Sequence, residues 1–254
     1  YIMNLFFKIN PFIMFFPYFY SNSNKNPFKR PNLDSLKSLD LIIFDMDIIL
    51  TNNKSLDIII ESFNKIKNNN IPICILTNNS NNSPKKMKKT LKNMNYDLSN
   101  IHLISSNLLM TNKIENLCYN NRKQNFGIIS NLSFNSYIQY NINNKIKNNK
   151  PNMYYLENNI YPENIDYFII SSIDKNTFDT YSKIIENWFL HNKTAKIILT
   201  YSDENNLDNK YISPKKILNL YPIKHKEFEF VGIPNNTYII DEIKKFYGFK
   251  KLNN

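Results

Sequence analysis

Two carboxylates, Asp45 and Asp47, follow directly after a short apolar run, Leu41–Phe44. An uninterrupted apolar run of this length is typical of a strand that is buried on both faces, as in a parallel sheet. Residues i and i+2 of an extended chain point to the same side, so we expect the two carboxylates to lie together at the carboxyl end of this strand. Like charges at that distance are costly unless a cation or a proton offsets them. Because no basic residue is adjacent in the sequence, a metal ion is the natural partner.

A second polar group, Thr77–Ser80, ends another apolar run at residues 71–76. Between the two runs, apolar residues recur at helical spacing, which predicts strand, helix and strand in one right-handed unit. Ligands of open α/β sheets bind outside the carboxyl ends of the strands. Periodicity alone therefore predicts one polar crevice, lined by Asp45, Asp47, Thr77 and Asn78.

The order of these motifs resembles a known family. DMD at the end of a buried strand, followed one strand–helix–strand unit later by TNNS, is similar to the haloacid dehalogenase (HAD) superfamily of phosphatases. TNNS with Ser83 three residues later resembles its subclass IIA, the group of 4-nitrophenylphosphatases and phosphoglycolate phosphatases. The resemblance extends from about Leu39 to the end of the chain. It implies an α/β fold, with a Rossmannoid parallel-sheet core and an inserted α/β cap domain.

The predicted elements divide this part of the chain into three segments. They are the first part of the core at residues 34–106, the cap at residues 107–220, and a second, incomplete part of the core at residues 221–254. The prediction that the chain returns to the core at residues 221–254 rests on the apolar run Phe228–Val231 and the GIP turn after it. Both resemble the family's V-G-K-P strand and turn.

The predicted cap contains one further candidate motif. The strand Ala195–Thr200 is followed by Tyr201, Ser202 and Asp203. Members of the family have T-N-x-D near the substrate at a similar place. The resemblance therefore implies that Thr200 and Asp203 lie near the substrate, with Tyr201 in place of the asparagine.

Residues 1–33 differ in composition from the rest. The segment Leu5–Tyr20 is strongly apolar but is interrupted by polar residues and prolines, so it is too short and too broken for a membrane span. A segment rich in Ser, Asn and Lys follows it, and the first acidic residue is Asp34. This pattern resembles a signal or transit leader, and the alternative is a disordered or loosely packed arm. We expect the protein in the cytoplasm or, if the leader is real, in an organelle.

The resemblance also implies a reaction on a small phosphorylated metabolite. Asp45 would attack the phosphorus of a phosphate monoester and form an aspartyl-phosphate. Asp47 would protonate the leaving oxygen and later deprotonate the attacking water. Thr77 and Asn78 would hold the phosphoryl group, and Mg²⁺, bound at Asp45 and Asp47, would bridge the nucleophile and a phosphate oxygen.

Three departures from the family pattern bear on this reaction. Ile48 replaces the glycine after the second aspartate, and Ile233 replaces the lysine of V-G-K-P. The family's later segment, G-D-x-x-x-T-D, has no counterpart before Asn254. The expectation is a chain shortened at its C-terminus, with Leu41–Phe44 as an open apolar edge. The alternative is a degenerate relative that folds with a partner's help.

Two other functions stay open beside the phosphatase. The first is a catalytically inactive HAD-like protein that binds a phosphorylated ligand or a protein partner. A homodimer is possible under either function. The second is a nucleic-acid-binding protein, because the net charge of the 254 residues is +11. We regard nucleic acid as the weaker hypothesis, since the sequence has no zinc-ligand spacing and no basic helix with interleaved aromatic residues. Cys74 lies in a predicted core strand, where a small apolar filler is expected rather than a nucleophile.

Overall fold

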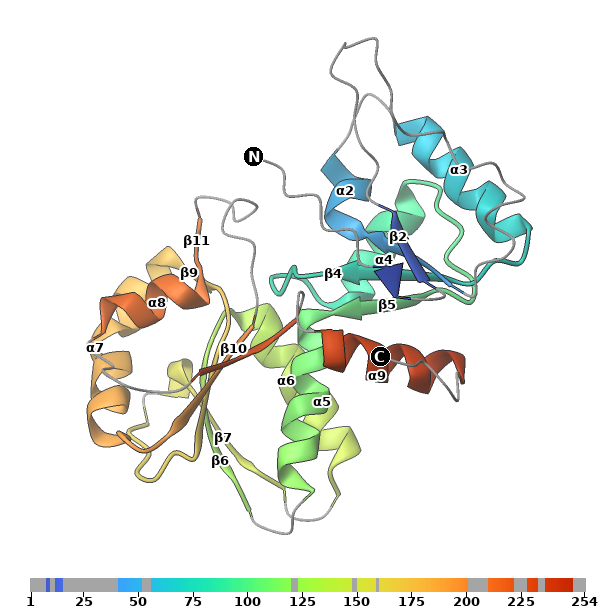
Figure 1. Cartoon of the computed structure of the whole chain (residues 1–254). Coiled ribbons are helices and arrows are strands. Elements are labelled where there is room, and N and C mark those ends of the chain that lie inside the picture. Colours follow the sequence, from blue (N-terminus) through green and yellow to red (C-terminus); the bar gives the residue numbers. More distant parts are fainter. Residues whose placement is uncertain are drawn as a thin grey trace. The chain divides into compact units, whose positions relative to one another are not determined.

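The computed structural model in Figure 1 describes residues 8–9, 12–15, 41–51, 56–119, 123–147, 150–158, 160–200, 210–221, 228–232 and 236–248. The chain divides into two compact units. The first takes residues 1–77, 87–104 and 243–254, and the second takes residues 78–86 and 105–242.

The first unit is built on a five-stranded sheet. Its strands, in spatial order, are β1 (Lys8–Ile9), β2 (Phe12–Phe15), β3 (Ile42–Asp45), β4 (Ile73–Thr77) and β5 (His102–Ser105). The pair β1–β2 is antiparallel, whereas β3 is parallel to both β2 and β4. The parallel sheet with intervening helices confirms the predicted α/β class.

Three helices accompany this sheet: α2 (Met46–Thr51), α3 (Leu56–Asn68) and α4 (Pro84–Asn93). Their apolar side chains form one core with β4, and Phe63 is at its centre, fully buried. The Phe63 ring centroid lies 5.3 Å from that of Phe44 and 5.1 Å from that of Tyr96. Ser83 caps the start of α4, because its Oγ accepts a hydrogen bond from the Lys86 amide at 3.3 Å.

The open edge expected at Leu41–Phe44 is not found, because β3 is an inner strand. Its neighbour is β2, with Ile13 opposite Ile42 and Phe15 opposite Phe44. Residues 8–9 and 12–15 thus form strands, where the sequence suggested a leader or a disordered arm. Backbone pairing of this kind removes the unpaired row of amides and carbonyls that makes an edge prone to aggregation.

The second unit has its own sheet of five parallel strands. In spatial order these are β12 (Phe228–Val231), β10 (Lys196–Thr200), β8 (Tyr167–Ile170), β6 (Asn125–Ile129) and β7 (Asn152–Tyr155). The central strands β6, β8 and β10 are mostly apolar and are buried except at their first residues, as expected of strands covered on both faces.

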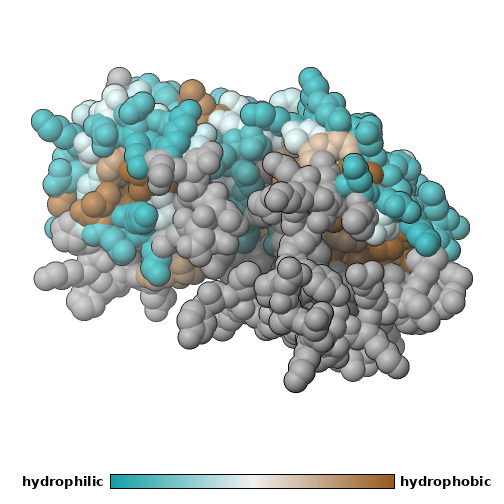
Figure 2. All heavy atoms as spheres, turned by 90° about the horizontal axis from the view of Figure 1, so that it is seen from above, coloured by the Kyte–Doolittle hydropathy of each residue, from teal (hydrophilic) through white to brown (hydrophobic). Residues whose placement is uncertain are grey.

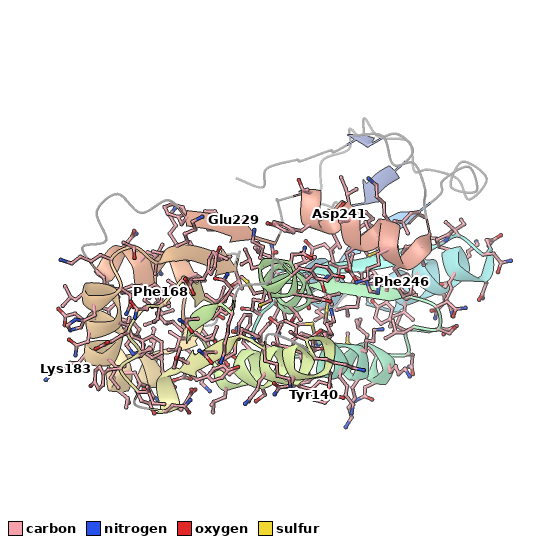
Figure 3. All side chains as sticks on the ribbon, turned by 90° about the horizontal axis from the view of Figure 1, so that it is seen from below. Tyr140, Phe168, Lys183, Glu229, Asp241 and Phe246 are labelled. Carbon is pink, nitrogen blue, oxygen red and sulfur yellow. The ribbon has the colours of Figure 1, made fainter. Side chains whose placement is uncertain are left out.

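Helices cover both faces of this second sheet (Figure 1). On one side are α7 (Lys175–His191) and α8 (Pro214–Leu220), and on the other are α5 (Ser106–Cys118) and α6 (Leu132–Lys145). Phe168 of β8 and Trp188 of α7 stack within the core, and Phe168 lies in the interior of this unit in Figure 3. A 3₁₀ turn, η1 (Leu156–Asn158), and a small antiparallel pair, β9 (Ile173–Asp174) with β11 (Tyr211–Ile212), complete it.

The strand that was predicted to return to the core does not do so. β12 pairs in parallel with β10, so it belongs to the second sheet. The second unit accordingly extends to Glu242, beyond the predicted cap boundary at residue 220, and it also takes residues 78–86. The last helix, α9 (Asn236–Tyr247), begins in the second unit and ends in the first. Gly232, directly after β12, has φ of 131°, which side-chain-bearing residues rarely adopt.

Among the helices that the structure describes, none has both the length and the apolar character needed to cross a bilayer. Hydrophilic residues cover most of the described surface on the face in Figure 2.

Candidate active site

Asp45 and Thr77 end neighbouring parallel strands of the first unit. Asp45 is the last residue of β3 and stands opposite Leu76 of β4, so Thr77 is one residue further along the next strand. Thr77 is buried with an exposed fraction of 2%, and Asp45 is half-buried. The parallel pairing therefore brings a carboxylate residue and a hydroxyl residue to the same edge of the sheet, as the periodicity predicted.

The extended geometry predicted for Asp47 is wrong. Helix α2 begins at Met46, directly after β3, so Asp47 is helical and the i, i+2 rule of a strand does not apply. Aspartate is favoured immediately before a helix and in its first turn, because the unpaired amides there attract negative charge. Met46 and Ile49 turn into the apolar core, which stabilises the helical start. Ile48 lies in the same helix.

The polar loop after Thr77 is built into the second unit. The carbonyl oxygen of Asn78 accepts a hydrogen bond from Ser106 Oγ at 3.3 Å. The amide of Asn81 donates to Asn79 Oδ1 at 2.9 Å, so the loop also bonds to itself. Asn78 follows Thr77 directly in the chain, and the bond between its carbonyl oxygen and Ser106 lies within the second unit.

Thr200 is the only part of the predicted cap motif that the described residues include. It ends β10 with 1% of its surface exposed, and its Oγ1 donates to Ser171 Oγ at 3.1 Å. Asp203 lies outside the described residues, as do Tyr201 and Ile233. The role of Thr200 and Asp203 at the substrate stays a prediction.

The sequence analysis missed a row of buried polar residues at the carboxyl ends of β6 and β8. They are Ser130, Asn131, Ser171 and Ser172, with exposed fractions between 0% and 8%. Each follows an apolar strand directly, so the rule that found Thr77 and Asn78 would have found these residues as well.

Oxygen donors at the end of β3 suit a hard cation. HAD enzymes in general use Mg²⁺, which proteins hold by one or two carboxylates while water and substrate phosphate complete the shell. Asp45 and its sequence neighbour Asp47 supply that number of carboxylates. The described residues include no group of three or more His, Cys, Asp or Glu side chains that could hold a metal ion. The residue types agree with the expected Mg²⁺ site at Asp45 and Asp47, which stays a prediction.

Comparison with known proteins bears on both the family and the fold. Residues 42–138 match the model of the haloacid dehalogenase-like hydrolases. No curated protein matches the chain in sequence. The similar solved structures named below are 14–17% identical to this chain, and at such identity the likeness shows the fold alone.

Three of these structures carry phosphatase names. One is a thermostable double-mutant NPPase from Geobacillus stearothermophilus, at 17% identity and a TM-score of 0.59, covering 84% of this chain and 77% of that chain. A p-nitrophenyl phosphatase from Archaeoglobus fulgidus has 14% identity and a TM-score of 0.58, with 82% and 74% covered. A 4-nitrophenylphosphatase from Thermotoga maritima has 17% identity and a TM-score of 0.56, with 85% and 77% covered. The matched segment and the similar fold agree with the resemblance seen in the motifs: residues 42–138 are similar to the haloacid dehalogenase-like hydrolases, and the fold is similar to that of solved nitrophenylphosphatases.

Proposed function

We propose that the protein hydrolyses a small phosphate monoester through an aspartyl-phosphate on Asp45. The observation that carries the proposal is the pairing of β3 with β4, which ends in Asp45 on one strand and Thr77 on the next. A nucleophilic carboxylate and a phosphate-binding hydroxyl are the two groups that the first step needs within reach of one phosphoryl group.

In the first step an oxygen of Asp45 forms a bond to phosphorus while the bond from phosphorus to the alcohol oxygen breaks. The proton of Asp47 passes to the departing alkoxide, so the alcohol leaves neutral. The Thr77 hydroxyl and Asn78 hold the oxygens of the phosphoryl group, whose charge has to be stabilised during transfer.

In the second step water attacks the phosphorus of the aspartyl-phosphate. Asp47, now ionised, takes a proton from that water, and the bond to Asp45 breaks to release orthophosphate. Both aspartates return to their starting protonation states, so the cycle is closed. Mg²⁺, when bound at Asp45 and Asp47, would neutralise charge on the phosphate and the nucleophile.

The test is Mg²⁺-dependent release of 4-nitrophenol from 4-nitrophenyl phosphate by the full chain. Asp45→Asn should lower the rate by about a thousandfold or more, because the amide is no nucleophile. Asp57→Asn is the matched control, since Asp57 is an exposed aspartate in the first turn of α3. Hydrolysis that survives in Asp45→Asn would exclude Asp45 as the nucleophile.

A second candidate is an inactive HAD-like protein that binds a phosphorylated ligand. Ile233 supports it, because it stands where the family has the lysine of V-G-K-P, and the loss of that positive charge removes electrostatic stabilisation of a phosphoryl group. This candidate predicts saturable binding of orthophosphate without turnover of any aryl phosphate. Turnover that depends on Asp45 would reject it.

A further inference from the structure

The loop at residues 78–82 is held from one side by the start of helix α5. Ser106 Oγ donates to the carbonyl oxygen of Asn78 at 3.3 Å, and Asn107 Nδ2 donates to that of Asn82 at 3.2 Å. Asn107 is fully buried, and its Oδ1 has no hydrogen-bond partner among the described residues. An unpaired buried oxygen costs free energy of folding. The favourable contribution of the Asn107 side chain is therefore its Nδ2 hydrogen bond to the loop.

The same loop is held from another side by the ends of β8 and β6. Ser172 Oγ lies 3.0 Å from Ser80 Oγ and donates to Asn81 Oδ1. Asn131, which also caps α6, donates from Nδ2 to the same Asn81 oxygen at 3.1 Å and to the Ser172 carbonyl at 3.0 Å. Two residues of the second sheet thus converge on one side chain of the loop.

These bonds are buried or partly buried and are made by neutral groups. Ser172 and Ser80 expose 0% and 2% of their surface, and Asn131 exposes 8%. Water competes poorly for hydrogen bonds in such surroundings, so the contacts persist and fix the groups that they join. The loop has no apolar side chain to bury, so these bonds replace packing as the source of its order.

We propose that Ser172 and Asn131 are positioning residues, which fix loop 78–82 in the conformation that presents Asn78 to a phosphoryl group. The proposal rests on the function proposed above. Hydrogen-bond donors to a phosphoryl group stabilise its charge best when they are already oriented before the substrate binds. The bonds reach the loop at Ser80 and Asn81, two and three residues beyond Asn78, so they restrict its backbone without touching the substrate.

The structure offers a matched control for Ser172. Ser130 also follows a strand of the same sheet, exposes 1% of its surface and donates its hydroxyl to an asparagine Oδ1, that of Asn135. Among the described residues, the hydroxyl of Ser130 bonds to Asn135 and not to the loop. Ser172→Ala loses the hydroxyl contacts with Ser80 and Asn81 of the loop, whereas Ser130→Ala loses a buried hydroxyl bond to Asn135, outside residues 78–82. Asn81→Ala removes the same bond as Ser172→Ala from the less buried side, which guards against a folding defect.

The experiment measures amide hydrogen exchange of residues 78–83 in the full chain, together with KM, kcat and inhibition by orthophosphate. We expect Ser172→Ala and Asn81→Ala to speed exchange of the loop and to raise both KM and the orthophosphate inhibition constant about tenfold, with kcat less affected. Ser130→Ala should lower the melting temperature comparably but leave loop exchange unchanged. Equal loop exchange in Ser172→Ala and Ser130→Ala would overturn the proposal. If loop exchange separates the variants while the wild type neither hydrolyses nor binds phosphate, the anchoring is supported and the proposed reaction falls.

Discussion

The residues at the end of β3 show that the sequence determines where a buried strand ends more clearly than it determines the backbone conformation that follows. Asp45 lies where the sequence placed it, because apolar periodicity determines where a buried strand ends. Asp47 does not, because the apolar pattern at Met46 and Ile49 suits a helix as well as a strand and the core accepts it as a helix. A short apolar run cannot distinguish the two from sequence alone.

A pH-dependent contribution to stability is expected from Asp97. Lys67, and then Ser99, donate hydrogen bonds to its carboxylate and lower the pKa of Asp97 to about 2. Between pH 3.8, where the unfolded carboxyl titrates, and about pH 2, the unfolded chain binds more protons than the folded one. The stabilisation is therefore complete above this range and is lost as pH falls through it. Thermal melts from pH 5 to pH 2 should show that Asp97→Asn flattens this part of the profile, and an unchanged profile would contradict the assignment.

At the scale of elements, the placement of β12 was the main error of the sequence analysis. The run Phe228–Val231 has the same apolar character as a strand of either sheet, so only tertiary contacts choose between them. The contacts that join β12 to the second unit include a charged network. Lys113 of α5 lies 2.8 Å from one carboxylate oxygen of Glu229 on β12 and donates to Tyr238 Oη of α9 at 2.9 Å (Figure 3 labels Glu229).

Removal of the Lys113 ammonium should loosen β12. Burial lowers the pKa of Lys113, but its bonds to Glu229 and Tyr238 outweigh burial and raise the pKa above its ordinary value, so the lysine stays charged. Lys113→Met should reduce the free energy of unfolding by about 1–2 kcal/mol, because Glu229 loses its cation, and should speed amide exchange in β12. Lys183→Met is the control, since Lys183 is exposed on α7 and points outward in Figure 3. Equal effects of the two substitutions would argue against the network.

At the scale of the molecule, the sequence predicted two α/β parts and their order, because strand and helix periods alternate along the chain. It did not predict where the parts divide. Loop 78–82 joins the second unit through Ser172 and Asn131, and such polar contacts between distant segments leave no periodic signal. Pairing of β2 with β3 was likewise missed, because the composition of residues 1–33 suggested a leader or a loosely packed arm.

The pairing of β2 with β3 should protect the first sheet. Met14→Pro removes a backbone amide from the strand whose register places Met14 opposite Ile43. We expect a lower melting temperature and concentration-dependent aggregation, because β3 would then present an open apolar edge. Met14→Leu keeps the amide and should behave as the wild type. Identical light scattering of the two variants on heating would show that β2 does not protect β3.

The central claim, a covalent intermediate on Asp45, can be tested by trapping. The full chain is mixed with Mg²⁺ and excess 4-nitrophenyl phosphate, quenched in acid within a turnover, digested, and its peptides are analysed by mass spectrometry. We predict a phosphoryl group on the peptide that contains Asp45, and on no peptide of the Asp45→Asn variant. Steady turnover with an unmodified Asp45 peptide, or a phosphoryl group on another residue, would contradict the account.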